Sequence, residues 1–407
     1  MTMNFKEFIT EQKNTHMTHI EDKVIYGGVD GTRQAIFALR SLRDMLAGTS
    51  KGKVSVKWDG APAIFCGEDP SDGKFFVAKK GIFNKNPKVY KTDSEIDEDT
   101  SGDLAEKLKD ALKYLSKMNI KGVIQGDFLF GRGDLKTENI DGQKYVVFHP
   151  NTIAYAVPYD QSEVIRQAKI GIVWHTTYTG SSFENMKASY GVDVKSINKN
   201  KDVWSQDAML RDLTNATMSG RETKEVNQLL TQAGKLFNQV SGTTLRQLES
   251  NPELAQMIEQ FNNTYVRKGQ VIGDTRKHVD NLISFISDKF QKEIDKRKTD
   301  KGKSAQSEKR DSLLVFFSKE NRSSLIKMFE LQKVIVLAKL KLINSLDKLK
   351  TIDTFVKTPN GYKVTGEEGY VAIDNLGGDA VKLVDRMEFS YNNFSPDILK
   401  GWESGRR

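Results

Sequence analysis

The sequence predicts an α+β fold in which a β-rich block is interrupted by a long helical segment and completed by strands near the C-terminal end. Three observations support this prediction: dense β-type segments over about 50–180, repeated helical patterns over 184–350, and β-type segments again over 363–390. We therefore divide the sequence into an N-terminal peptide (1–19), a core in two parts (20–183 and 351–407) and a helical insertion (184–350).

Composition limits the class of protein. The 407 residues are 38% hydrophobic and 29% charged, which suits a soluble globular protein of two or three domains. A formal net charge of +8 favours a polyanionic partner such as nucleic acid. The single cysteine, Cys66, excludes an internal disulfide and fits a reducing compartment such as the cytoplasm. No apolar run approaches the ~20 residues that a membrane span needs, so we expect no membrane partner. The oligomeric state is not predicted.

The first predicted helix precedes the β-rich block. Asp30 is expected to cap it, its apolar residues recur at helical spacing, and it ends near Gly48. Residues 54–65 then predict two strands joined at Asp59-Gly60, which is a strong signal for a two-residue hairpin turn.

Lys57 would lie where the first of these strands meets the turn, and Gly60 would let a bulky ligand approach the backbone. A lysine amine is a nucleophile only in its neutral form, which burial and neighbouring cations favour. The alternative is an ordinary exposed lysine on a hairpin, because so short a motif also recurs by chance.

The rest of the β-rich block follows in order. Strands are expected at 74–81, 121–130, 145–148, 151–157 and 170–178. Between the first two of these, residues 92–103 predict an acidic loop, and residues 104–118 predict an amphipathic helix. Asp127 interrupts an apolar strand, so its carboxylate must find a partner or face a cleft.

The predicted insertion is mostly helical. Apolar stripes predict helices over 226–240 and 254–265, and Asp274 is expected to cap a third helix. Residues 289–310 hold far more basic than acidic side chains and few apolar ones, so we expect a flexible basic loop. Such a loop either contacts a phosphate backbone or is a solvated linker.

Five short motifs occur along the chain in a suggestive order. They are Lys57-Trp-Asp-Gly60, Gly126-Asp127-Phe128, the strand that ends at Phe148, Glu368-Gly-Tyr-Val371 and Val381-Lys-Leu383. This order resembles the covalent nucleotidyltransferase superfamily, which includes ATP-dependent DNA ligases, RNA ligases and mRNA capping enzymes. The resemblance covers about residues 50–160 and 362–390. It implies a ligase-type nucleotidyltransferase fold with antiparallel sheets similar to those of ATP-grasp proteins, carrying a large helical insertion.

The resemblance also implies roles for single residues. Lys57 looks like the nucleophile that becomes lysyl-AMP, with ATP and Mg²⁺ as substrate and cofactor. The nucleotide-binding positions would be Asp59 and Gly60 beside the nucleophile, Lys80 on a phosphate, Asp127 on the ribose, Phe148 stacked on the base, and Lys382 on the α-phosphate. Glu368 looks like the carboxylate that serves the metal ion.

The sequence also departs from the family pattern. Pro62 follows the first motif where many DNA ligases have an arginine, and Asp127 is one methylene shorter than the usual glutamate. Val384 stands where a second lysine is common, with Arg386 as a candidate substitute. The residues after the last motif are too few for a C-terminal OB-fold, which favours an RNA ligase over a DNA ligase or a capping enzyme.

Residues 1–11 carry a second resemblance. They are similar to the capsid-targeting peptides of internal head proteins from large tailed phages, and Ile9-Thr10-Glu11 matches the triplet cut by the prohead protease. Cleavage would fall between Glu11 and Gln12. The partners implied are a prohead protease and the capsid interior. The alternative is a short amphipathic helix docked on the core.

Three functions therefore stay open. The first is an ATP-dependent polynucleotide ligase acting on nucleic-acid ends, with RNA favoured over DNA. The second is a catalytically degenerate nucleotidyltransferase that binds nucleic acid as an internal phage head protein. The third is a transferase that passes the nucleotide to a protein or small molecule. The protein would lie in the host cytoplasm, or in the virion if packaged, and the sequence does not distinguish ATP from GTP.

Overall fold

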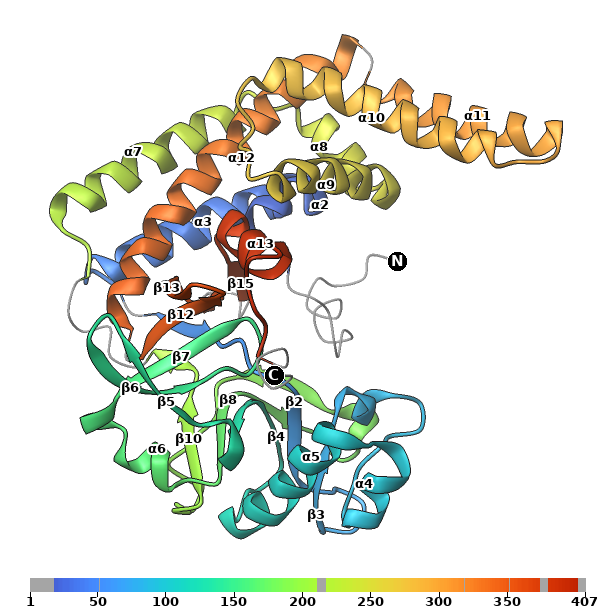
Figure 1. Cartoon of the computed structure of the whole chain (residues 1–407). Coiled ribbons are helices and arrows are strands. Elements are labelled where there is room, and N and C mark those ends of the chain that lie inside the picture. The colour runs from blue at the N-terminus through green and yellow to red at the C-terminus, as the bar shows by residue number, and fades with distance from the viewer. Residues whose placement is uncertain are drawn as a thin grey trace.

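Three β-sheets lie beneath a layer of helices in the computed structural model of the chain, which describes residues 18–50, 52–210, 217–317, 319–350, 352–373 and 380–401 (Figure 1). The predicted α+β class is confirmed. Most strand pairs are antiparallel, and one pair in the second sheet is parallel.

The first sheet joins strands from both parts of the sequence. Its order is β11 (Met209–Leu210), β1 (Lys53–Lys57), β14 (Gly369–Ile373) and β15 (Ala380–Leu383), all antiparallel. Side chains alternate between the two faces of a strand. One face therefore presents apolar residues to the helical layer, and these are Val54, Tyr370, Ala372, Val381 and Leu383. The opposite face carries Lys57 and Lys382.

The second and third sheets contain the remaining strands. The second has the order β10 (Val203–Asp207), β8 (Ile170–Thr179), β4 (Val123–Gly131), β2 (Ala63–Glu68) and β3 (Phe75–Ala78), with β9 (Lys187–Tyr190) paired to β8. The third has the order β13 (Gly361–Val364), β12 (Asp353–Thr358), β7 (Ile153–Pro158), β6 (Gln143–Phe148) and β5 (Lys136–Ile140).

The helix α5 (Gly102–Leu115) packs on the second sheet, as its apolar stripe predicted.

The helical layer includes an early segment as well as the predicted insertion. It contains α2 (Lys23–Tyr26), α3 (Gly28–Leu46), α7 (Gly220–Phe237), α8 (Gly242–Glu249), α9 (Pro252–Arg267), α10 (Thr275–Asp295), α11 (Asp300–Val315) and α12 (Lys319–Leu346). The predicted start of the insertion at residue 184 is wrong, because β9, β10 and β11 extend the sheets before α7 begins. No helix in the described ranges is both long and apolar enough to cross a membrane.

The predicted hairpin at residues 54–65 does not form. β1 pairs with β11 and β14, whereas β2 pairs with β3 and β4, so the Asp59-Gly60 turn connects two different sheets. The Ala61 N–H donates to the carbonyl of Phe128 on β4 at 2.9 Å, which directs the chain into the second sheet. Lys57 nevertheless ends its strand at this turn, as the sequence predicted.

Two predicted loops are helices. Within 92–103, α4 (Asp93–Asp99) begins with a capping box in which Thr92 and Glu95 satisfy each other's backbone N–H groups. The predicted basic loop 289–310 instead forms the end of α10 and the start of α11. Lys, Arg, Glu and Gln are good helix formers, so a charged segment with few apolar residues is still helical here.

The remaining helices are short. α6 (Glu163–Gln167) lies between β7 and β8. α13 (Arg386–Phe394) begins directly after β15, where the sequence predicted continued strand, because the Asp385 side chain accepts hydrogen bonds from the backbone N–H groups of Met387 and Glu388. The predicted capsid-targeting peptide and its Ile9-Thr10-Glu11 triplet lie outside the described residues.

Candidate active site at the end of strand β1

The first sheet brings Lys57 and Lys382 onto one face. Lys57 lies opposite Gly369 on β14, and Ser55 lies opposite Val371, which in turn lies opposite Lys382 on β15. Ser55 and Lys57 are two residues apart on one strand, so both lysines project from the same side of the sheet. Segments from the two ends of the sequence thus meet at the end of β1.

Glu368 completes this group. Lys57 Nζ forms an ion pair with Glu368 Oε2, and the two side chains are 32% and 10% exposed. The lysine is therefore reachable by a ligand, while its carboxylate partner is mostly covered. The sequence predicted both residues at one site, and the structure brings them into contact.

Burial and charge set the electrostatics of the three groups. Burial raises the pKa of Glu368 to about 7, although the Lys57 charge acts in the opposite direction. Burial, followed by the repulsion from Lys57, lowers the pKa of Lys382. The arrangement therefore holds two cationic groups around one carboxylate that gains a proton easily.

The Asp59 carboxylate is engaged by the protein itself. It accepts hydrogen bonds from Asn151 Nδ2 at 2.7 Å, from the Thr152 N–H at 2.7 Å and from the Ile153 N–H at 2.8 Å. Its own backbone N–H donates to Tyr155 Oη at 2.7 Å. In this structure Asp59 therefore anchors the turn after Lys57 to the start of β7, which is a structural role that the sequence did not predict.

Gly60 lies tightly against the strand that carries Asp127. A Cβ atom at Gly60 would lie 2.6 Å from Asp127 Cβ and 3.0 Å from the Phe128 carbonyl oxygen. Close approach of the turn to β4 thus requires glycine. Asp127 is partly exposed, and one of its oxygens lies 3.7 Å from His175 Nε2. The structure thus places Asp127 beside the turn that follows Lys57.

Two predicted nucleotide contacts are not brought to this site. The Phe148 side chain is fully buried, with ring centroids 5.0 Å from Phe130, 5.5 Å from Tyr155 and 6.2 Å from Trp204. Its ring has no surface free for a base, so the prediction of stacking is wrong for this structure. Lys80 is exposed at the start of the 3₁₀ turn Lys80–Phe83, and no ion pair joins it to another described residue.

Arg386 is also engaged elsewhere. Its guanidinium lies 2.9 Å from Asp22 Oδ2 and 3.6 Å from Glu21 Oε1, and it contacts the Asn263 side chain. It therefore ties α13 to the helical layer, and the expectation that it replaces a phosphate-binding lysine is not supported.

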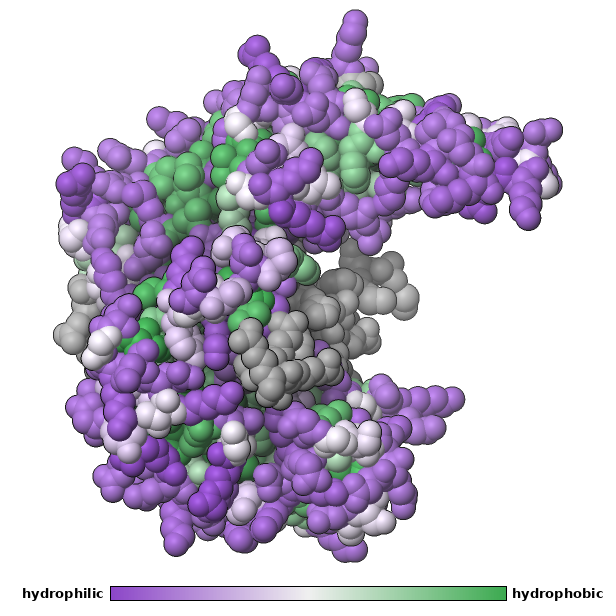
Figure 2. Space-filling model, viewed as in Figure 1, coloured by the Kyte–Doolittle hydropathy of each residue, from purple (hydrophilic) through white to green (hydrophobic). Residues whose placement is uncertain are grey.

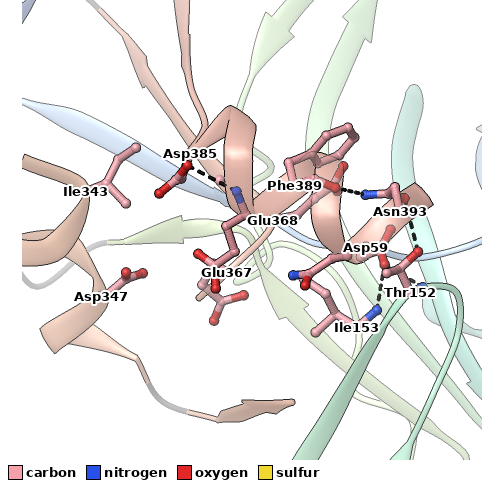
Figure 3. Close-up of a pocket in the computed structure, with 13 residues that line it drawn as sticks. Asp59, Thr152, Ile153, Ile343, Asp347, Glu367, Glu368, Asp385, Phe389 and Asn393 are labelled. Atoms are coloured by element: carbon pink, nitrogen blue, oxygen red, sulfur yellow. Dashed lines mark hydrogen bonds between the residues drawn. The ribbon is translucent and has the colours of Figure 1, made fainter. Parts of the chain in front are cut away.

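A pocket beside Glu368 contains residues that the sequence analysis missed (Figure 3). Its lining brings together six carboxyl groups, from Asp59, Asp347, Glu367, Glu368, Asp385 and Glu388. Glu367 is the most unusual, because its Oε2 atom has no hydrogen-bond partner among the described residues. Burial raises its pKa to about 8. The adjacent acidic pair Glu367-Glu368 before an apolar strand was the signal that could have indicated this pocket.

The neighbouring carboxyl group of Asp347 is also perturbed. Tyr370 Oη donates a hydrogen bond to Asp347 Oδ1 at 2.6 Å, and burial raises the pKa of Asp347. Within the described ranges, no three His, Cys, Asp or Glu side chains are grouped so as to hold a metal ion by themselves. A divalent ion at this pocket would need further oxygen ligands from a substrate or from water.

Fold and site together define an α+β protein in which a partly exposed lysine and a buried carboxylate meet at the edge of an acidic pocket. The chain belongs to DUF6267, which is described as a family of unknown function and whose sequence model matches residues 14–397. Neither a curated protein nor a solved structure matches this chain.

Proposed function

We propose that this protein is an ATP-dependent polynucleotide ligase that acts through a covalent Lys57–AMP intermediate and joins RNA ends in preference to DNA ends. The observation that supports the proposal most is the ion pair between Lys57 and Glu368, with Lys382 on the same face of the sheet. In nucleotidyltransferases the residues that these three resemble belong to one active site. Lys57, Glu368 and Lys382 must therefore lie close together, although they are far apart in the sequence.

The first step is attack by the Lys57 amine on the α-phosphorus of ATP. Glu368 is in contact with Lys57 Nζ and has a pKa raised to about 7, so it can accept the proton that the ammonium must lose. An N–P bond forms, the bond from the α-phosphorus to its bridging oxygen breaks, and pyrophosphate leaves. Lys382 would balance negative charge on the α-phosphate.

The later steps return Lys57 to its free form. A 5′-phosphate oxygen of the nucleic acid attacks the α-phosphorus and displaces the lysine, which takes up a proton. A 3′-hydroxyl then attacks the 5′-phosphorus, and AMP leaves as the phosphodiester bond forms. Asp127 would accept a hydrogen bond from a ribose hydroxyl, because its carboxylate is partly exposed beside the Gly60 turn.

The pocket carboxylates fit a magnesium ion. In their ionised forms, Glu368 and Glu367, whose Oε2 atom has no partner among the described residues, would supply hard oxygen ligands. Mg²⁺ commonly uses one or two carboxylates and completes its shell with water and substrate phosphates. When bound, it would supply charge neutralisation on the triphosphate.

The test is transfer of label from α-labelled ATP to the protein in the presence of Mg²⁺. We expect wild type to become labelled and Lys57→Ala to lose the label, since the proposed covalent bond is made by the Lys57 amine. Lys53→Ala is the matched control, because Lys53 is an exposed lysine at the other end of β1. Each of the other nucleoside triphosphates should be run in parallel. Absence of label with all of them, in folded wild type, would refute the proposal.

The second candidate function is that of a catalytically degenerate nucleotidyltransferase that binds nucleic acid inside a phage head. The specific observation in its favour is that Asp59 and Phe148, two of the implied nucleotide contacts, are occupied by contacts within the protein. It predicts no label and salt-sensitive binding to nucleic acid. It also predicts that mature protein in virions begins at Gln12, which mass spectrometry can measure.

A further inference from the structure

The helices α10 and α11 form a hairpin that projects from the helical layer (Figure 1). We call residues 289–310, which include its turn, the basic arm. Thr299 caps α11 by accepting a hydrogen bond from the Gly302 N–H at 3.2 Å. Both helices of the hairpin begin at a capping residue, Asp274 for α10 and Thr299 for α11. The structure is therefore a helical hairpin, whereas the sequence suggested a flexible loop.

Few apolar contacts hold the basic arm. Within residues 289–310 the buried side chains are Phe290 and Ile294, both on α10. The buried residue of α11, Leu313, lies beyond the arm. The turn and the first half of α11 are exposed and hydrophilic, as Figure 2 shows for the projecting end.

The charge at the turn of the arm is not balanced. Arg297, Lys298, Lys301 and Lys303 are exposed, and none of them forms an ion pair with a described residue. Asp300 is the single acidic residue among 296–303. The neighbouring Lys296 and Lys309 differ, because they are paired with Glu293 and Glu253. Four cations are thus left available for a partner.

We infer that these four cations bind the sugar-phosphate backbone of the nucleic acid whose ends Lys57 would join. The inference rests on the proposed function, because a ligase must hold its polynucleotide well beyond the reacting end. Cations on an exposed helical turn neutralise phosphates without reading sequence, and they release counterions as they do so. The arm would therefore add affinity, but no sequence preference.

An anionic membrane surface fits the arm less well. Helices that bind membranes insert a broad apolar face between the lipids. The large apolar residues of the basic arm, Phe290 and Ile294, are instead buried. Residues 296–309 hold no large apolar side chain. The surface therefore matches a polyanion that is bound through charge alone.

The test compares two variants that lose the same number of charges. The arm variant is Arg297→Ala/Lys298→Ala/Lys301→Ala/Lys303→Ala. The control is Lys187→Ala/Lys195→Ala/Lys199→Ala/Lys201→Ala, which removes four exposed lysines between β8 and β10. Affinity for a nicked DNA duplex and a nicked RNA duplex is measured by fluorescence anisotropy over a series of salt concentrations, after thermal melts show both variants folded.

For the arm variant we expect weaker binding and a salt slope (log K against log[salt]) smaller by up to about 3.6 on DNA, since each phosphate contact contributes about 0.9. The control should keep most of the wild-type slope. Equal loss in both variants, no loss in the arm variant, or arm-dependent binding to anionic lipid vesicles alone would each overturn the inference.

Label transfer from ATP separates this inference from the proposed function. The arm variant should label Lys57 as wild type does, because the arm is not part of the site. If wild type binds nucleic acid through the arm but never labels, the ligase proposal fails and the arm is still a nucleic-acid surface. If the protein labels and the arm has no effect on binding, only the arm inference fails.

Discussion

Asp59 belongs to the Lys57-Trp-Asp-Gly60 motif, and its side chain stabilises the fold. Its carboxylate joins the turn after Lys57 to residues 151–153 through three hydrogen bonds. The motif could predict that Lys57, Glu368 and Lys382 belong to one site. It could not predict the partners of Asp59, because they lie in a loop without any motif of its own.

The hydrogen bonds of Asp59 lead to a stability prediction. Asp59→Ala leaves two buried backbone N–H groups without an acceptor, so we expect the free energy of unfolding to fall by about 2–4 kcal/mol. Asp59→Asn keeps one acceptor oxygen and should lose less. Urea unfolding of the three proteins measures the difference. A loss below about 0.5 kcal/mol for the alanine variant would show that water replaces the carboxylate.

Glu367 should make stability depend on pH. Its pKa is about 8 in the folded chain against an ordinary value of 4.5, so the folded state holds a proton that the unfolded state has already released. The contribution of Glu367 to the free energy of unfolding therefore falls as the pH rises from about 4.5 to 8. Glu367→Gln removes this titration, and at pH 8 we expect it to be more stable than wild type by on the order of 1–2 kcal/mol.

Thermal melts from pH 5 to pH 9 measure this effect. The gap between Glu367→Gln and wild type should widen as the pH rises and should then level off above pH 8. A constant gap would show that Glu367 does not titrate in this range. Other groups also titrate here, so only the difference between the two proteins is informative.

Phe148 illustrates a limit of sequence reasoning for single residues. An aromatic residue at the end of a strand suits base stacking as well as it suits a core. Which of the two applies depends on whether Phe130, Tyr155 and Trp204 pack around the ring. These residues come from other strands, one earlier in the chain and two later. Periodicity within one strand carries no information about that packing.

At the scale of elements, the connection from β1 to β2 determines where Lys57 lies. The two strands enter different sheets, so Lys57 lies at a corner between sheets rather than on a hairpin. The helix α3 was predictable because its apolar positions repeat and become its buried face. The corner between the sheets was not predictable, because an Asp-Gly pair also suits a hairpin. Whether a hairpin or a corner forms depends on the pairing of β1 with β14 and of β2 with β4.

The corner leads to a prediction for Gly60. In Gly60→Ala the new Cβ atom would lie 2.6 Å from Asp127 Cβ, so the turn or β4 must shift. We expect a loss of about 1–3 kcal/mol in the free energy of unfolding. Gly133→Ala is the control, because nothing lies within 4 Å of a Cβ atom at Gly133. Equal stability of the two variants by urea unfolding would contradict the close packing described for the turn.

Across the whole molecule, buried ions join α12 to the short 3₁₀ segment Ile20–Asp22 and to α13. Lys339 of α12 pairs with Glu21 at 2.8 Å, with 1% and 5% of their side chains exposed. Arg386 extends the group to Asp22 and to α13, directly after the strand of Lys382. The α+β class was predictable from segment patterns. The group of buried ions was not predictable, since its members are isolated charged residues in three separate segments of the sequence.

The buried pair should contribute strongly to stability. Lys339→Met leaves Glu21 buried without its main partner, so we expect the free energy of unfolding to fall by about 3–5 kcal/mol. Lys348→Met is the control, because the Lys348–Glu222 pair is 50% and 41% exposed and should contribute less than about 1 kcal/mol. Adding Glu21→Gln to Lys339→Met should recover part of the loss. Equal losses for the two lysine variants in urea would contradict the assignment.

The pairing of β1 with β14 also bears on biosynthesis. A ribosome makes Lys57 early, but Glu368 and the strand β14 that follows it emerge only after α12, the last helix of the helical layer, has been translated. A polypeptide that terminates prematurely within α7 to α12 would therefore contain the amine without Glu368 or Lys382. Such fragments should be unable to react with a nucleotide, so full-length translation is a precondition for any covalent chemistry at this lysine.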